Sequence, residues 1–454
     1  MKRKILKYMA AASFIFTFIA LIIPPSFQST ASGWTAVLIN DLAANSIRSS
    51  GMTFQNNPIK IDNHGNVHIV YNKEWQIYDI FNNSGYFNET AFPGIRGSSP
   101  SFDIDSEGKI HLSYYIQSET GYADIYYYKE GDSSSIKITS GDGVYFNPSI
   151  AVDSNGYVHI AFMETVEQGD NKYFRILYTD NVGGTFKTPV ELNYTNYINF
   201  GHPSIVVDAN GVSHIVCYSR DNSGVYIVYA NYSSGVLSQP IKVNSTLVSA
   251  NISAPIPDLT VDGNNNIHIV FSAADLDHYS NGNPNFNYTA VYYVNYSNGV
   301  FSTPIKVSGN VEITSHPSIA LDTNGVIHIV FAGHPRTELL DYDIFYVDNS
   351  TGSFSSPLKI FDTEHTDYLP HIEVDSHGFS HIVFYETLND LSASKLYYLT
   401  NSPYPPHEIN RGMPVWLWIV IGVAIGAGVI GLAIFGWKKY KQLEKELEKE
   451  IRKK

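Results

Sequence analysis

A short motif that runs from Asp to His recurs seven times along this chain and limits what the chain can fold into. In every copy an apolar residue precedes Asp, a turn containing Gly or Asn follows, and His stands six positions after Asp. The pairs are Asp62/His68, Asp105/His111, Asp153/His159, Asp208/His214, Asp262/His268, Asp322/His328 and Asp375/His381. A proline lies four or five positions before each Asp. Such a period indicates repeated units that bury their cores against one another.

Each repeat predicts four strands. The segment before Asp alternates as a half-buried strand does, the D-x-N-G or D-x-x-G sequence forms a tight hairpin, and His opens the second strand. The fourth strand contains a proline, which is tolerated on an edge strand. The third strand carries a recurring tyrosine, namely Tyr78, Tyr127, Tyr178, Tyr229, Tyr293, Tyr346 and Tyr398. Four-stranded units arranged around an axis form a β-propeller.

The last repeat lacks a fourth strand, because Pro403 to Pro406 follow its third strand. The missing pattern occurs at the other end of the chain, in Gly33 to Ile39. We therefore predict an all-β, seven-bladed β-propeller over residues 33–402, closed by pairing of this N-terminal strand with the last repeat.

The two ends of the chain indicate a membrane protein. Residues 1–32 have a basic start, an apolar stretch and a small polar segment, which predicts a signal peptide, with an uncleaved signal anchor as the alternative. After a linker at 403–412, Met413 to Trp437 is an uncharged stretch of 25 residues that predicts a C-terminal transmembrane helix. Lysines follow it at once, so the tail 438–454 is expected in the cytoplasm and the propeller at the cell surface, outside the membrane. Gly422 and Gly426 would allow a homodimer through this helix.

Charge limits the partners of the predicted propeller. Residues 33–410 contain 16 Lys and Arg against 39 Asp and Glu, a net charge of −23 that excludes nucleic acid and anionic lipid as partners. Cys217 is the single cysteine and lies in an apolar run, so we expect a buried, inert thiol. Nine N-x-S/T sequons predict a glycoprotein, at Asn82, Asn88, Asn193, Asn231, Asn244, Asn251, Asn287, Asn295 and Asn349.

The repeat P-S-I-A-V-D-x-N-G-x-x-H-I-V-F resembles those of the BNR or sialidase-like propellers of prokaryotic surface proteins, over about residues 33–402. It departs from the Asp-box motif of that group, because two residues separate Asp from Gly and His replaces Trp. The resemblance implies a propeller fold. Sialidase activity is not expected, because the arginines of this region, Arg48, Arg96, Arg175, Arg220 and Arg336, match no part of the sialidase catalytic triad.

The seven Asp/His pairs lie on separate repeats, so they cannot converge on one site, and we interpret them as structural hydrogen-bonding pairs. No metal or cofactor motif is present in the sequence, and no catalytic residue is predicted. A ligand site is expected instead where the repeat breaks, at the loop-rich mouth of the central channel. The predicted ligand-binding residues are His202, Arg220, His316, Arg336, Tyr368 and His371. Their side chains would bring local positive charge and a flat aromatic face, unless His202 and His316 merely pack beside the prolines that follow them.

Three functions compete. The first is a cell-surface module that binds a glycan or a protein ligand without chemistry. The second is a glycan-active enzyme, a polysaccharide lyase or glycoside hydrolase, which requires His202, His316 and a Tyr or Arg to converge. The third is a structural component of the cell envelope.

Overall fold

The computed structural model describes residues 29–42, 58–82, 85–141, 143–169, 171–192, 199–221, 224–243, 256–275, 288–334, 342–363, 365–387 and 394–406. These residues lie in strands, turns, bends or irregular loops, and none of them is helical. The described part of the chain therefore confirms the predicted all-β class.

Five of its six sheets are single blades of four or five strands. The first blade contains β3 (Ile59–Ile61), β4 (Val67–Lys73), β5 (Gln76–Asn82) and β6 (Phe87–Arg96). The next contains β15 (Asn199–Val207), β16 (Ser213–Asp221), β17 (Gly224–Ser233), β18 (Val236–Leu237) and β19 (Ile241–Lys242). It is followed by β20 (Asp258–Val261), β21 (Ile267–Ala274), β22 (Thr289–Ser297), β23 (Val300–Phe301) and β24 (Ile305–Lys306).

The last two of these blades include strands from the start of the chain. One has β25 (Ile313–Leu321), β26 (Ile327–His334), β27 (Asp343–Asp348), β28 (Leu358–Asp362) and β1 (Ser29–Thr30). The other has β29 (Thr366–Val374), β30 (Ser380–Thr387), β31 (Ser394–Thr400) and β2 (Thr35–Leu42).

The sixth sheet has eight strands. They are β7 (Ser98–Ile104), β8 (Ile110–Gln117), β9 (Ala123–Lys129), β10 (Ile136–Lys137), β11 (Val144–Val152), β12 (Val158–Gln168), β13 (Asn171–Asp180) and β14 (Val190–Glu191). A parallel pairing of Val144 with Ala123 joins its two antiparallel halves.

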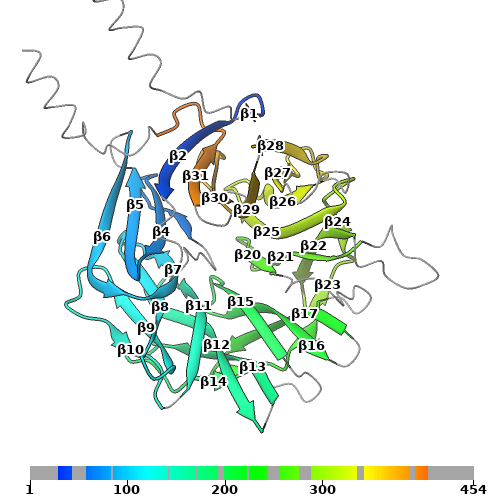
Figure 1. The fold of residues 1–454 in the computed structure, drawn as a ribbon. Helices are drawn as coiled ribbons and strands as arrows, with labels where there is room; N and C mark the ends of the chain where they lie inside the picture. Colours follow the sequence, from blue (N-terminus) through cyan, green and yellow to red (C-terminus); the bar gives the residue numbers. More distant parts are fainter. Residues whose placement is uncertain are drawn as a thin grey trace, which may run out of the picture. The chain divides into compact units, whose positions relative to one another are not determined.

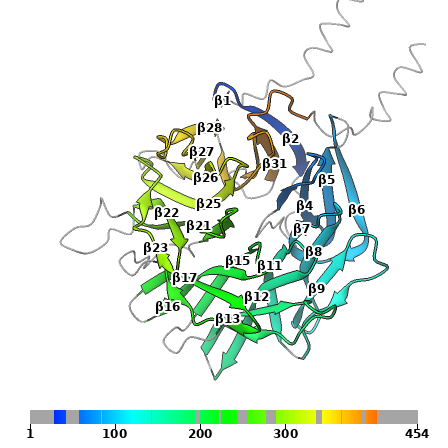
Figure 2. The ribbon, with the colours of Figure 1, turned by 180° about the vertical axis from the view of Figure 1, so that it is seen from behind.

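The sheets stand around a common axis, as Figure 1 and the reverse view in Figure 2 show. The innermost strands β3, β7, β11, β15, β20, β25 and β29 contact one another in chain order, and β29 contacts β3. This closed circle of inner strands makes the fold a β-propeller.

The hydrophobic core lies between neighbouring sheets. One cluster joins the sheet of β16 and β17 to that of β21 and β22, through Val216, Tyr229, Ile269 and Phe271. The thiol of Cys217 is fully buried in the adjoining cluster, as predicted. Each sheet is therefore stabilised mainly by the sheets on its two sides.

The N-terminal strand closes the ring as predicted. β2 pairs antiparallel with β31, with Thr35 opposite Thr400 and Val37 opposite Tyr398. β1 pairs with β28 of the preceding sheet, so this short segment of chain crosses from one blade to the next.

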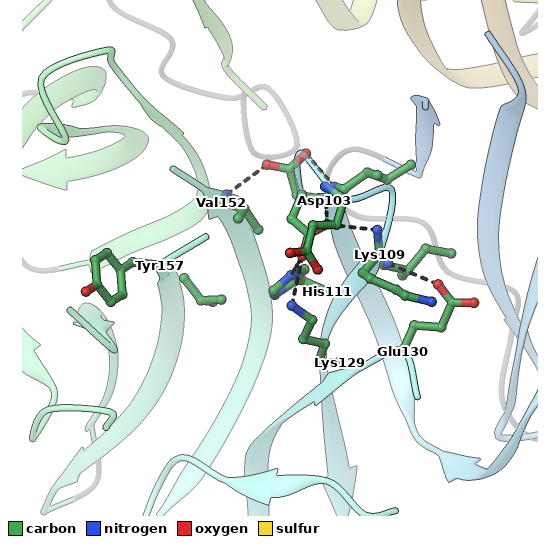
Figure 3. A network of polar contacts seen from close by, with 12 residues as sticks. Asp103, Lys109, His111, Lys129, Glu130, Val152 and Tyr157 are labelled. Carbon is green, nitrogen blue, oxygen red and sulfur yellow. Dashed lines mark hydrogen bonds and ion pairs between the residues drawn. The ribbon is translucent and has the colours of Figure 1, made fainter. Parts of the chain in front are cut away.

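The repeated Asp and His side chains stand at the hairpin between the first two strands of a repeat, and in the second repeat they form a hydrogen-bonded chain. Asp105 Oδ1 accepts the backbone N–H groups of Glu107 and Lys109, which fixes the turn. His111 Nε2 lies 3.0 Å from Asp105 Oδ2 and His111 Nδ1 lies 2.8 Å from Tyr127 Oη; Figure 3 shows His111 in this network, with Lys129 beside it. The same His–Tyr contact joins His159 to Tyr178, His214 to Tyr229, His268 to Tyr293, His328 to Tyr346 and His381 to Tyr398, at 2.5 to 2.8 Å. These contacts support the structural interpretation of the pairs.

These tyrosines also contact an aromatic ring of the repeat that follows in the ring. The pairs, with their centroid separations, are Phe186 on Tyr127 (5.1 Å), Phe301 on Tyr229 (5.8 Å), Phe354 on Tyr293 (5.0 Å), Trp34 on Tyr346 (5.0 Å) and Phe87 on Tyr398 (5.0 Å). All five are edge-to-face contacts, a favoured geometry for aromatic rings. Trp34 of the N-terminal segment thus makes the contact that a phenylalanine makes elsewhere.

The first repeat replaces this tyrosine with a carboxylate. The sequence pattern aligns Tyr78 with the other tyrosines, but the register places Phe81 opposite His68, so Asp79 takes the equivalent position. That alignment was wrong by one residue, and Tyr78 instead stacks on Tyr71 on the other face of the strand. Asp79 Oδ2 lies 2.9 Å from His68 Nδ1.

This substitution raises the pKa of the histidine. Burial opposes a charge on His68, but the carboxylates of Asp79 and Asp62 raise the pKa of His68 above its usual value. Burial also raises the pKa of Asp79. Burial lowers the pKa of His111, His159, His214, His268 and His328. The His68–Asp79 pair therefore holds a proton more tightly than the His–Tyr pairs of those repeats.

Several predicted features lie outside the described residues. They are residues 1–28, Arg336, the sequons at Asn193, Asn244, Asn251 and Asn287, the span 413–437 with Gly422 and Gly426, and the tail 438–454. Across the described ranges no helix is long and apolar enough to cross a membrane.

The first prediction concerns closure of the ring. Trp34→Ala removes the buried ring that packs on Tyr346, and we expect the free energy of unfolding to fall by about 3 kcal/mol, as for other buried aromatic truncations. Denaturant unfolding of the purified protein measures the change. Tyr404→Ala, at a side chain that is 87% exposed, is the control and should be neutral. Equal stability of the Trp34 variant and the parent would contradict closure by this contact.

The second prediction concerns pH. Because folding raises the pKa of His68, its stabilisation is complete below the unfolded value of about 6.5 and is lost as the pH rises through the folded value. The unfolding midpoint of the parent should therefore fall between pH 6 and pH 9. Asp79→Asn removes the carboxylate and should flatten this part of the profile. A parent and variant with the same slope over this range would show that the pair does not bind the proton.

Candidate functional site

Five innermost strands contain a β-bulge at a proline. The ladders of β7, β11, β15, β25 and β29 with their partners all shift register around this point. The residue before each of these prolines has a left-handed backbone: Ser99 (φ 47°), Asn147 (φ 50°), His202 (φ 49°), His316 (φ 49°) and Leu369 (φ 55°). Proline cannot donate to the ladder, which accounts for the bulge. A left-handed backbone at a residue other than glycine is strained, and such strain gathers at functional sites.

Three of the predicted site residues, His202, His316 and His371, form what we call the histidine cluster. His202 lies on β15, His316 on β25 and His371 on β29, and all three side chains are half-buried. The His202 ring acts electrostatically on His316, and the His316 ring acts on His371. His202 and His316 stand on inner strands that are separated by β20. Each histidine is therefore within electrostatic range of the next.

The histidine cluster is uncharged at neutral pH. Burial lowers the pKa of His202 to about 4. Burial, with the charge of the neighbouring histidine, lowers the pKa of His316 to about 4 and that of His371 to about 3. Burial therefore acts against the predicted local positive charge at these three residues, because placing a charge among protein atoms is costly.

Tyr218 belongs to the same site although it was not predicted to. Its ring centroid lies 5.8 Å from that of His202. Gly201 stands opposite Tyr218 in the β15–β16 ladder, and a Cβ atom on Gly201 would lie 2.5 Å from the Tyr218 ring. Gly201 is thus required for the tyrosine to lie across the strand. A glycine inside a predicted strand is a known sign of close approach and could have identified this residue.

The other predicted residues take separate places. Arg220 is exposed near the end of β16, and its charge acts on Tyr218. Tyr368 lies opposite Tyr385, with ring centroids 6.3 Å apart, and burial raises the pKa of Tyr368. Arg336 lies outside the described residues.

Four charged side chains, Lys60, Asp103, Asp258 and Glu373, form a second group on the inner strands, which we call the charged cluster. Lys60 Nζ lies 2.5 Å from Glu373 Oε1, joining β3 to β29. Burial acts to lower the pKa of Lys60, but the carboxylates of Glu373, Asp103 and Asp258 outweigh it and raise the pKa. Sequence analysis missed this cluster, because its members come from strands that are far apart along the chain.

The carboxylates of the charged cluster also link neighbouring repeats. Asp258 accepts hydrogen bonds from Ser204 Oγ at 3.1 Å and Ser318 Oγ at 2.8 Å, on the strands to either side. Asp103 Oδ2 accepts the N–H of Val152 at 2.8 Å, as Figure 3 shows. The inner wall of the ring is therefore held by charged and hydroxyl side chains as well as by apolar packing.

The described residues form two surface cavities but no group that meets the requirements of a metal site. No group of three His, Cys, Asp or Glu side chains in the described ranges could hold a metal ion. Two cavities lie between outer strands, one lined by Pro357 and Lys359 and the other by Phe186 and Pro189, and neither contains a predicted site residue.

The fold is similar to solved structures of glycan-active enzymes, while the sequence matches no protein-family model and no curated protein. A polysaccharide lyase, a PL25 ulvan lyase bound to a GlcA(1-4)Rha3S saccharide, has a TM-score of 0.54 and 11% identity, and the match covers 80% of this chain and 95% of that one. The GH93 α-L-arabinofuranosidase of Fusarium graminearum in complex with arabinobiose has a TM-score of 0.43 and 13% identity, over 66% of this chain and 91% of that one. The sialidase of Trypanosoma rangeli in complex with the inhibitor DANA has a TM-score of 0.38 and 9% identity, and the match covers 69% of this chain and 56% of that one.

These likenesses concern the fold. At 11% identity the match to the ulvan lyase establishes a shared propeller architecture and carries no activity with it. The match to the ulvan lyase agrees with the predicted propeller at the level of the fold.

Proposed function

We propose that this chain is a membrane-anchored, extracytoplasmic, seven-bladed β-propeller that binds a glycan at the mouth of its central channel. The count of seven treats the eight-stranded sheet as two blades, because one parallel pairing joins its halves. The location rests on the sequence of the two ends, with the leader in residues 1–32 and the span at 413–437.

The observation that carries the binding proposal is the ring contact of His202 on β15 with Tyr218 on β16, together with the electrostatic interaction of His202 with His316 on β25. A neutral imidazole offers one hydrogen-bond donor and one acceptor, which suits the hydroxyl groups of a sugar. A half-buried tyrosine adds a flat face and a hydroxyl. Polar groups placed against an aromatic wall are typical of small-molecule sites.

The ionisation of the histidines favours binding over catalysis. A general base works best when its pKa lies near the working pH. With pKa values of about 4, His202 and His316 are weak bases at pH 7. They are better suited to hold a ligand than to remove a proton from it.

A glycan-active enzyme, a polysaccharide lyase or glycoside hydrolase, is the second candidate. Two histidines and a tyrosine do lie together, which is the arrangement that such an enzyme requires. The ulvan lyase with the shared fold gives this candidate its substrate class, polysaccharides. Binding of a substrate would have to raise the pKa of one histidine, or a tyrosine would have to act as the base.

The third prediction tests binding. The purified protein should bind glycans on an array of neutral, amino-bearing and acidic saccharides. The triple variant His202→Ala, His316→Ala and Tyr218→Ala should bind at least about tenfold more weakly, as expected when central contacts of a site are removed. Its thermal unfolding midpoint should show that the ring remains folded.

The matched control changes the same residue type elsewhere. His64→Ala with His377→Ala removes two histidines that are 75% and 77% exposed on hairpins, and binding should be unchanged. Full binding by the folded triple variant would place the site elsewhere.

The fourth prediction separates the two candidates. Incubation of the parent protein with each glycan that it binds should release no new reducing ends and no unsaturated sugar. Cleavage that is lost in the His202→Ala variant alone would replace the binding function with the enzymatic one.

A further inference from the structure

The charged cluster lies next to the histidine cluster. Lys60 acts electrostatically on His371, and His316 acts on the same ring. His371 and Glu373 are two residues apart on β29, on one face of that strand. A sugar held by the histidines is therefore close to the charges of Lys60, Asp103, Asp258 and Glu373.

The balance of these charges is negative. One ammonium group faces three carboxyl groups, and the four influence one another. Burial raises the pKa of Asp258 and Glu373, which favours their neutral forms. Opposing this, Asp258 accepts hydrogen bonds from two hydroxyl groups and from the N–H groups of Leu259 and Ile319, and these donors favour the ionised form. The ammonium group of Lys60 opposes protonation of Glu373, and with Asp258 alone protonated the cluster keeps a net negative charge.

Lys60 is already engaged by a partner. Its Nζ lies 2.5 Å from Glu373 Oε1, and the three carboxylates together hold its proton. An anionic sugar that approached Lys60 would have to compete with Glu373 and would also meet Asp103 and Asp258. The ammonium group of Lys60, which could have attracted an anion, is therefore already neutralised by a carboxylate of the protein.

Among the described residues, the side chains beside the charged cluster do not reverse this balance. The histidine cluster adds no positive charge at neutral pH. Arg220 is exposed at the end of β16, where solvent and salt screen its charge. The long-range field of residues 33–410, with a net charge of −23, repels anions before they reach the site.

From these observations we infer that the site takes an uncharged or amino-bearing sugar and rejects uronates and sulfated sugars. The inference rests on the proposed glycan-binding function and names the chemical class of its ligand. It also sets the site apart from a saccharide such as the one bound by the ulvan lyase, which contains GlcA and Rha3S.

The fifth prediction tests this selectivity with the full-length protein. Laminarin fragments serve as the neutral probe, chitosan fragments as the amino-bearing probe, and alginate fragments as the uronate probe. At low salt, one or both of the first two should bind at least about tenfold more tightly than alginate, and the difference should shrink as salt screens the carboxylates.

A charge-only variant localises the effect. Asp103→Asn keeps the size of the side chain and removes one negative charge. The ratio of the affinity for chitosan fragments to that for alginate fragments should therefore fall about threefold. Asp362→Asn removes the same charge from β28, where the side chain is 43% exposed, and should leave the gap unchanged. Should the Asp103 variant fail to fold, the salt dependence of the parent decides the question.

The outcomes distinguish the two proposals. Alginate binding as tight as chitosan and laminarin binding, lost in the His202, His316 and Tyr218 variant, would overturn the charge selectivity and keep the glycan site. Absence of binding by every probe would overturn the glycan function and this inference with it. A neutral or amino-bearing preference that disappears in the triple variant would support both.

Discussion

The fold depends on a tyrosine that is held from two sides. Its hydroxyl group forms a hydrogen bond with the histidine of its own repeat, as Tyr127 does with His111. Its ring packs edge-to-face on an aromatic side chain of the next repeat, as Tyr127 does on Phe186. The first contact closes a hairpin and the second joins two blades. Because the contact is repeated around the ring, each blade is stabilised by its neighbour, and the last blade requires an aromatic residue from outside its own repeat. Trp34 supplies it by packing on Tyr346, so ring closure follows from the same interaction as blade packing.

The inner wall of the ring uses different chemistry. The ion pair of Lys60 with Glu373 joins the first and last innermost strands, and Asp258 links three successive strands through Ser204 and Ser318. Proline-dependent bulges turn His202 and His316 away from the regular ladder. The same left-handed backbone occurs at Ser99, Asn147 and Leu369, so it belongs to the repeat. The argument for a ligand site is that His202 and His316 occupy two of these five positions and that His202 contacts Tyr218.

Features that are set locally could be predicted from the sequence. The Asp of each hairpin and the proline of each inner strand affect only the backbone within a few residues of them, so their repetition predicted the strands. The pattern of Gly33 to Ile39 predicted the pairing of β2 with β31. Other features depend on partners that are distant in the sequence. Tyr78 and Asp79 differ by one residue, and only the register with His68 decides which of them faces it. The charge of His371 depends on burial among strands that begin hundreds of residues apart, and no local pattern reports it. Tyr218 depends on Gly201, a residue of another strand.

The central claim is that His202, His316 and His371 form a half-buried, uncharged cluster on the inner strands of the ring. Titration of the histidine ring signals by NMR, with assignment by single substitutions, measures this directly. The account predicts pKa values of about 4 for His202, about 4 for His316 and about 3 for His371, with all three signals shifted by a bound glycan. Three independent titrations near the ordinary value of about 6.5 would mean that the side chains are solvated and apart, and would contradict the site.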